Sequence, residues 1–190
     1  MTFYRWLIPA FWLLFIAYWA VMAFGAKRNL GSAAGWRRQI GARLLIIAAV
    51  LLVLRFPGSR RAVREMMAYR PGELLSLIGA AICGLGVAFA IWARTVLGRN
   101  WGMPMSRKQD PELVTRGPYA YVRHPIYTGV LFALLGSAIG QNLVWLLPLV
   151  PAVAYFVYSA RQEERLMLQQ FPVQYGAYMK RSKMLLPFLY

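Results

Sequence analysis

The feature that most constrains this chain is a long stretch without a charged residue, residues 125–160. At a rise of about 1.5 Å per residue, a single helix of this length would be far longer than the hydrocarbon core of a bilayer. The stretch is interrupted by Gly140, Gln141 and Asn142, which are typical of a turn. We therefore expect a tight helical hairpin that crosses a membrane twice, with Gly136 and Gly140 in a GxxxG spacing at its tip.

The composition indicates a membrane protein rather than a soluble domain. The 190 residues are 59% hydrophobic and 15% charged, whereas a soluble domain carries about 25% charged residues. The chain has 22 Lys and Arg against 6 Asp and Glu. Because the basic residues flank apolar runs, we attribute this charge to membrane topology and anionic lipid headgroups, and we expect no nucleic-acid partner. With a single cysteine and a single histidine, no metal site is expected.

Three further apolar runs precede the hairpin, so the predicted fold is an all-α polytopic membrane bundle of about five transmembrane helices. Residues 6–24 and 74–93 contain no charge and are long enough to form or approach a crossing. Residues 44–54 form a shorter aliphatic run between two arginines that can extend toward the headgroups. Small residues share one face of the third run and favour close helix packing; they are Gly79, Cys83, Gly86 and Ala90.

The chain divides into an N-terminal part, residues 1–96, with three spans, and a C-terminal part, residues 97–190. The second part contains a polar connector, the hairpin and a tail with the composition of an amphipathic interfacial segment. Basic residues are more numerous on the side of the connector and the tail, which the positive-inside rule places in the cytoplasm. The connector on the opposite side departs from that rule, since it carries Arg55, Arg60, Arg61, Arg64 and Arg70.

The hairpin brings two polar segments to the same membrane face. The residues that can converge there are Arg123, His124 and Tyr127 at its entrance and Arg161, Glu163 and Glu164 at its exit. Adjacent glutamates after an apolar helix need a partner, which an arginine or the ammonium group of a ligand would supply. Because neighbouring helical residues point about 100° apart, we expect only one glutamate to face the bundle. We predict that it is Glu163 and that Glu164 faces the surface or Arg165.

The order of the motifs resembles the isoprenylcysteine carboxyl methyltransferase and phospholipid methyltransferase family of membrane enzymes. The motifs are LGRNWG, LVT, GPYAYVRHPIYTG, the charge-free hairpin, EERLM and FPVQYGAY, which together cover roughly residues 97–187. The resemblance implies that the chain binds S-adenosyl-L-methionine at the cytoplasmic face without a Rossmann domain. The implied cofactor-binding residues are Glu112, Leu113, Val114, Tyr119, His124, Pro125, Ile126 and Tyr127, with Glu163 or Glu164 near the amino group of the cofactor.

The resemblance also implies methyl transfer to a lipophilic small molecule or a lipidated substrate, with carboxyl O-methylation as the first expectation. The candidate catalytic residues are Arg123, His124 and Arg161, because an arginine orients a carboxylate and a histidine accepts a proton from an amine. Many carboxyl methyltransferase relatives have an arginine one helical turn before the first glutamate, where this chain has Ser159. A phospholipid amine N-methyltransferase is therefore the alternative. A sterol-reductase-like enzyme and a non-catalytic membrane protein are more distant ones.

Overall fold

The computed structural model describes residues 6–23, 55–100 and 112–186. The expected span at residues 44–54 and the connector at residues 101–111 lie outside the described residues. The described α-helices are α1 (Leu7–Ala23), α3 (Pro57–Ala68), α4 (Glu73–Leu97), α5 (Pro125–Gly140), α6 (Leu146–Gln170) and α7 (Pro172–Arg181). Within the described ranges the only β-structure is an isolated bridge, so the predicted all-α class is confirmed.

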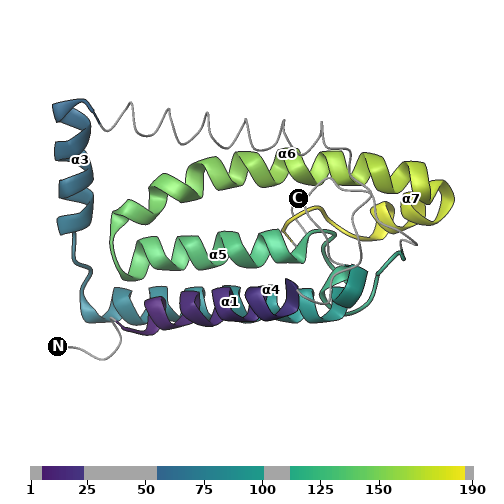
Figure 1. Cartoon of the computed structure of the whole chain (residues 1–190), viewed down its shortest axis with the longest axis horizontal. Coiled ribbons are helices and arrows are strands. Elements are labelled where there is room, and N and C mark those ends of the chain that lie inside the picture. The colour runs from purple at the N-terminus through teal and green to yellow at the C-terminus, as the bar shows by residue number, and fades with distance from the viewer. Residues whose placement is uncertain (1–5, 24–54, 101–111, 187–190) are drawn as a thin grey trace.

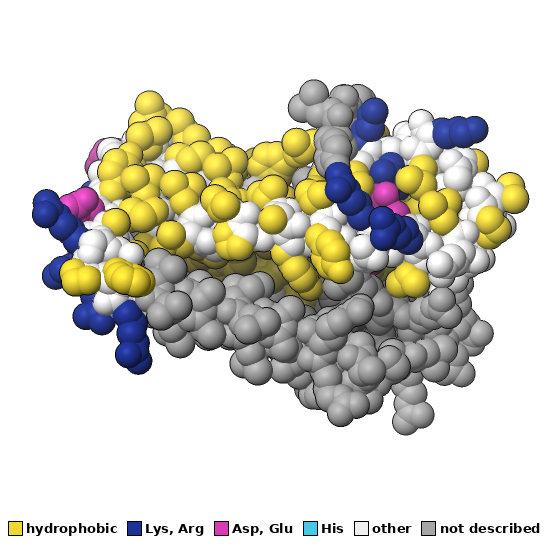
Figure 2. Space-filling view, turned by 90° about the horizontal axis from the view of Figure 1, so that it is seen from above, with side chains coloured by type: hydrophobic (Ala, Val, Ile, Leu, Met, Phe, Trp, Pro, Cys, Tyr) yellow, Lys and Arg dark blue, Asp and Glu magenta, His cyan; other side chains and the backbone are white. Residues whose placement is uncertain are grey.

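The long helices lie side by side and form a membrane bundle (Figure 1). Helix α4 and the continuous stretch Leu143–Gln170 are long and apolar enough to cross a membrane, and α1 and α5 are shorter apolar helices. Helix α1 packs on α4, and α5 packs against both α4 and α6. Figure 2 shows hydrophobic side chains over the middle of the molecule and Lys and Arg toward its two ends, the pattern of a bundle that crosses a bilayer.

The helical hairpin predicted from the charge-free stretch is confirmed. Helix α5 ends at Gly140, and a short 3-10 turn, η4 (Leu143–Trp145), leads into α6. Helix α6 contains Pro151 and is curved in its first half (Figure 1), because an internal proline removes one backbone hydrogen bond and clashes with the preceding turn. The helix continues beyond the apolar stretch to Gln170. Both Glu163 and Glu164 therefore belong to the same regular helix as the return span.

The contact between α4 and α5 is built from small residues, as their spacing predicted. Gly79, Cys83, Gly86 and Ala90 are all buried on α4. A Cβ atom added at Gly86 would lie 2.6 Å from the backbone nitrogen of Ala133 and 2.6 Å from the carbonyl oxygen of Gly129. The two backbones are therefore too close to admit a side chain at Gly86.

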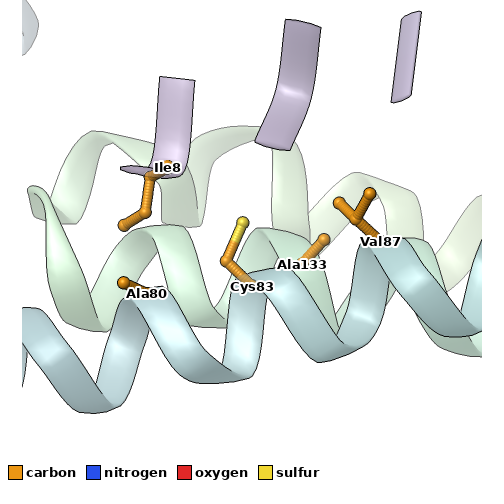
Figure 3. Packing of buried hydrophobic residues seen from close by; sticks show 5 residues of the cluster. All are labelled: Ile8, Ala80, Cys83, Val87 and Ala133. Atoms are coloured by element: carbon orange, nitrogen blue, oxygen red, sulfur yellow. The ribbon is translucent and has the colours of Figure 1, made fainter. Parts of the chain in front are cut away.

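Helix α1 covers the same interface from outside. Ile8 is 2% exposed and packs with buried residues of α4 and α5. Figure 3 shows this cluster, which consists of Ile8, Ala80, Cys83, Val87 and Ala133. Trp12 of α1 adds one polar contact, because its indole nitrogen donates a hydrogen bond to Ser137 of α5 at 3.0 Å. The first expected span is therefore an integral part of the bundle.

The connector before α4 contains a helix, α3, that the sequence analysis did not predict. It runs crosswise to the long helices at the end of the bundle that holds the hairpin turn (Figure 1), and it contacts η4. Pro57 occupies its first turn, where a proline costs no hydrogen bond. None of its residues is buried. Helix α4 begins at Glu73, directly after Pro71 and Gly72, one residue before the apolar run expected at residues 74–93.

The tail packs against the connector at the other end of the bundle. Tyr175 and Tyr178 form the buried face of α7, and the Tyr178 hydroxyl donates to the backbone oxygen of Tyr119 at 2.5 Å. Beyond α7, Lys183 and Val122 form a parallel β-bridge. The tail thus supports the segment that leads into α5.

Candidate active site

Four charged side chains from two distant segments meet where the connector enters α5. They are Arg123 and His124 of the connector and Glu163 and Glu164 of α6. His124 is the N-cap of α5 and Pro125 occupies the first turn, so the proline starts the helix immediately after the histidine. The backbone nitrogen of Arg123 donates to the Lys183 carbonyl at 2.8 Å. The tail therefore fixes the backbone from which both connector side chains extend.

His124 lies between the two glutamates and contacts both. Its Nδ1 is 3.4 Å from Oε2 of Glu163, and its Nε2 is 3.4 Å from Oε1 of Glu164. Burial of the ring disfavours its charged form, but the two carboxylates outweigh that effect and raise the pKa of His124 above its ordinary value. The imidazole at the centre of the cluster therefore favours its protonated form more than a free histidine does.

Glu164 is tied to Arg123 in a buried ion pair. The Arg123 Nε donates to Glu164 Oε1 at 2.6 Å, and the two side chains are 9% and 8% exposed. The same guanidinium donates to the backbone oxygen of Ser182. Arg123 thus joins α6 to the tail. The prediction that Glu164 faces the surface is wrong, because the arginine and the histidine together draw this carboxylate into the bundle.

Glu163 is the more accessible carboxylate of the pair, with 27% of its side chain exposed. Its Oε1 accepts hydrogen bonds from the Tyr127 hydroxyl at 2.5 Å and from the Ser159 hydroxyl at 3.1 Å. Ser159 is fully buried, at the position where the resemblance led us to expect an arginine. In this chain the position serves to hold a glutamate.

Three aromatic rings extend the cluster into the hairpin. The rings of His124 and Tyr127 are nearly parallel, with centroids 5.5 Å apart. Tyr127 in turn stacks on Phe156 of α6 at 4.4 Å. The stack holds the Tyr127 ring so that its hydroxyl reaches Glu163. Phe156 was not among the predicted site residues, since one aromatic residue in an apolar helix gives no distinctive signal.

The other predicted residues lie around this cluster in different environments. Tyr119 is 7% exposed, and burial raises the pKa of its hydroxyl, so this group is neutral at physiological pH. Pro125 is buried, whereas Leu113, Val114 and Ile126 are half-buried. Glu112 is exposed and accepts a hydrogen bond from the buried Asn100 at 3.3 Å. Arg161 is exposed on α6.

Sequence reasoning thus named every charged residue of the cluster but missed the part played by the tail. The backbone oxygens of Ser182, Lys183 and Met184 accept hydrogen bonds from Arg123 and His124. Backbone acceptors carry no signature in a sequence. The expectation of no metal at this site stays a prediction.

Comparison with known proteins identifies the family. Residues 74–174 match the family described as phospholipid methyltransferase. This match includes α4, the hairpin and all four charged residues of the cluster. The chain belongs to the phospholipid methyltransferase family.

Two of the similar curated proteins are named as metal-resistance proteins and one as a methyltransferase. The chain is 31% identical over 155 residues to the cobalt-zinc-cadmium resistance protein CzcN of Cupriavidus metallidurans, which covers 80% of this chain and 64% of the relative. It is 29% identical over 119 residues to the protein-S-isoprenylcysteine O-methyltransferase of Tribolium castaneum, with 60% of this chain and 42% of that protein covered. It is also 29% identical over 113 residues to the nickel-cobalt-cadmium resistance protein NccN of Alcaligenes xylosoxydans xylosoxydans, with 58% and 52% covered. The matched part of the chain spans 42% to 64% of the length of these curated relatives.

A solved structure with a similar fold is the eukaryotic intramembrane Ras methyltransferase, an isoprenylcysteine carboxyl methyltransferase. The TM-score is 0.55 at 24% sequence identity, and the match covers 84% of this chain and 55% of that chain. This likeness concerns the fold, and it agrees with the helical hairpin and the membrane bundle described above.

Proposed function

We propose that this chain is an S-adenosyl-L-methionine-dependent membrane methyltransferase that acts on a lipophilic substrate. The observation that carries the proposal is the buried cluster in which His124 joins Glu163 and Glu164, within the residues matched by the phospholipid methyltransferase family. When bound, the cofactor supplies an activated methyl group. The protein then needs to hold the reactants in position and exclude water, which a site at the end of a helical hairpin can do.

The donor set around Glu163 fits the amino group of this cofactor. Glu163 is partly exposed, whereas Glu164 is buried and already paired with Arg123. We therefore assign the ammonium contact to Glu163. Tyr127 and Ser159 hold its carboxylate in a fixed direction, so little ordering remains to be done when the ligand binds.

The rest of the cofactor pocket is proposed on the connector. The residues assigned to it are Glu112, Leu113, Val114, Tyr119, His124, Pro125, Ile126 and Tyr127. The residues up to His124 belong to the connector, which contacts the tail at Tyr119–Tyr178 and Val122–Lys183, and the other three begin α5. The excess of basic residues on this side supports a site that faces the cytoplasm.

For the methyl acceptor we propose a carboxylate on a lipophilic or lipidated substrate. A carboxylate needs no base and only a cation to orient it. Arg123 is buried, whereas Arg161 is exposed on α6 and can reach a substrate, so Arg161 is assigned to this contact. The relative from Tribolium castaneum is named as an O-methyltransferase, which supports an oxygen acceptor.

A phospholipid amine is the second candidate acceptor, and Ser159 is the observation that favours it. An amine must lose a proton before or during transfer. His124 lies between two carboxylates that raise its pKa, which makes its neutral imidazole a stronger proton acceptor. His124 or Glu163 would therefore be the proton acceptor in this case, and the two side chains lie 3.4 Å apart.

Methyl transfer to extracted membrane lipids and lipidated peptides tests the proposal. The purified chain is incubated in lipid vesicles with methyl-labelled S-adenosyl-L-methionine, and the organic extract is treated with base. Label released by base indicates a carboxyl ester, and label that resists base indicates a methylated amine. Incorporation that is absent, or that is equal in Glu163→Gln, would overturn the assignment.

A further inference from the structure

Helix α3 lies far from the candidate active site. It crosses the end of the bundle at the hairpin turn, whereas η3 (Gly117–Ala120) and α7 lie at the opposite end (Figure 1). It runs crosswise to α4, α5 and α6 (Figure 1), of which α4 and α6 are long and apolar enough to cross a membrane. A helix in this position lies parallel to the membrane plane at the level of the lipid headgroups.

The sequence of α3 separates charge from apolar surface. At about 100° per residue, Arg60, Arg61 and Arg64 fall on one side of the helix. Ala62, Val63 and Met66 fall on the other side. Val63 and Met66 are half-buried, and all three arginines are exposed. The helix thus has the two faces of an interfacial helix, with its apolar face toward the bundle and the acyl boundary.

Exposed apolar side chains border the basic face. Phe56, Met67 and Tyr69 are 61%, 51% and 39% exposed. Exposure of such large apolar groups to water is unfavourable. At a lipid surface, the two rings and the thioether can enter the acyl boundary while the arginines contact the phosphates.

The charge of this region calls for an anionic partner. Residues 55–70 contain five arginines and one acidic residue, Glu65. Glu65 pairs with Arg61 at 2.9 Å, so the segment keeps a surplus of positive charge. This surplus is the part of the sequence that departs from the positive-inside rule, and binding to anionic lipid accounts for it without changing the orientation of the bundle.

We propose that α3 is an interfacial helix that binds the anionic headgroups of phospholipids in the leaflet opposite the candidate active site. The arginines recognise the phosphate and glycerol oxygens of several lipids rather than one enclosed ligand. This role is independent of the methyl transfer proposed above. It anchors the hairpin turn through η4.

Local lipid preference at α3 provides the test. A bimane fluorophore is attached to Met67→Cys in a Cys83→Ala background, which removes the other thiol. The full chain is placed in phosphatidylcholine vesicles with increasing brominated phosphatidylglycerol or brominated phosphatidylcholine. We expect quenching by the anionic lipid to give a relative binding constant several-fold above one. A ratio of one would overturn the proposal.

Three triple variants separate α3 from the total charge of the chain. The first variant combines Arg60→Gln, Arg61→Gln and Arg64→Gln, and it should bring the ratio down to about one. The second variant replaces the same three arginines by lysine, and it should keep the ratio because lysine keeps the charge. Arg165→Gln, Lys180→Gln and Arg181→Gln, which remove the same charge at the opposite end, should leave the ratio unchanged. A ratio that survives the first triple variant, or falls equally in the last one, contradicts the proposal.

Salt provides a readout that needs no arginine variant. Because exposed charges are screened within about 8 Å at physiological ionic strength and within about 3 Å at 1 M, the preference for phosphatidylglycerol should decline as salt is raised. A preference that is insensitive to salt would show that headgroup charge is not what α3 recognises.

Discussion

The two faces of α5 contact their neighbours in different ways. Toward α4, glycines let the backbones touch, and Gly136 lies directly against the backbone of Cys83. Toward α6, the contact at the candidate site is carried by Tyr127, which stacks on Phe156 and donates to Glu163. The first face positions the helix with little polar chemistry and has no space for a ligand. The second face carries polar side chains that are held in place by hydrogen bonds and ion pairs with one another. A reaction can be supported at this face.

The largest expected effect concerns the polar face. Glu164→Gln should lower the free energy of unfolding by about 3–5 kcal/mol, because the buried Arg123 guanidinium loses its charged partner. Thermal unfolding in detergent, followed by circular dichroism, measures the loss. Glu65→Gln is the matched control, since its ion pair with Arg61 is exposed and contributes about 0.3–0.5 kcal/mol. Equal effects in the two variants would show that the Arg123–Glu164 pair is not buried in the folded protein.

The next effect concerns the apolar face. Gly136→Ala should cost about 1–3 kcal/mol, because the added Cβ falls against the backbone of Cys83 and no rotamer change can relieve the contact. Gly176→Ala in α7 is the control, since nothing lies within 4 Å of its Cβ position, and alanine there should be neutral or stabilising. Unfolding midpoints of the two single variants give the comparison. A tolerated Gly136→Ala would mean that α4 and α5 pack less closely than described.

A smaller effect is the pH dependence that His124 gives to the polar face. Its pKa is raised in the folded protein, so its contribution to stability is complete below the ordinary pKa of about 6.5. That contribution is lost as the pH rises through the raised pKa. The unfolding midpoint should therefore fall with rising pH in this range, and His124→Gln should remove that dependence. Because the chain has one histidine, NMR of nitrogen-labelled histidine follows the titration directly, and a pKa below 6.5 would contradict the described contacts.

The smallest effect on stability is expected at Arg161. Arg161→Gln should change the free energy of unfolding by no more than about 0.5 kcal/mol, because the side chain is exposed. The same variant should raise the KM for a carboxylate substrate if Arg161 orients it. Arg165→Gln, an exposed neighbour on α6, should leave the KM unchanged. A KM that is the same in both variants would remove Arg161 from the substrate contact.

Much of the apolar architecture could be predicted from the sequence because it depends on local patterns. The charge-free stretch and its Gly140–Gln141–Asn142 break gave the hairpin, and the small residues on α4 gave its contact with α5. Helix α3 was missed because its arginines were attributed to a connector. Its apolar residues are few and its contacts with the bundle are slight.

The polar cluster could be predicted in its membership but not in its geometry. A helical wheel separates Glu163 from Glu164 by about 100°, which led to the wrong expectation that only one of them faces the bundle. The two nitrogens of His124 lie on different sides of the ring, and each meets one glutamate. Two long side chains can therefore reach the same imidazole from different directions. A helical wheel shows only the directions of the Cα positions, so it does not predict such convergence.

The most direct test of the account is calorimetric titration of the purified chain with S-adenosylhomocysteine, the demethylated product of the cofactor. The account predicts measurable binding by the unchanged chain and by Glu65→Gln. It predicts that Glu163→Gln weakens binding at least about tenfold, or about 1.4 kcal/mol, because the partly exposed carboxylate would no longer meet the ammonium group. Absence of binding to the unchanged chain, or equal affinity in Glu163→Gln, would contradict it.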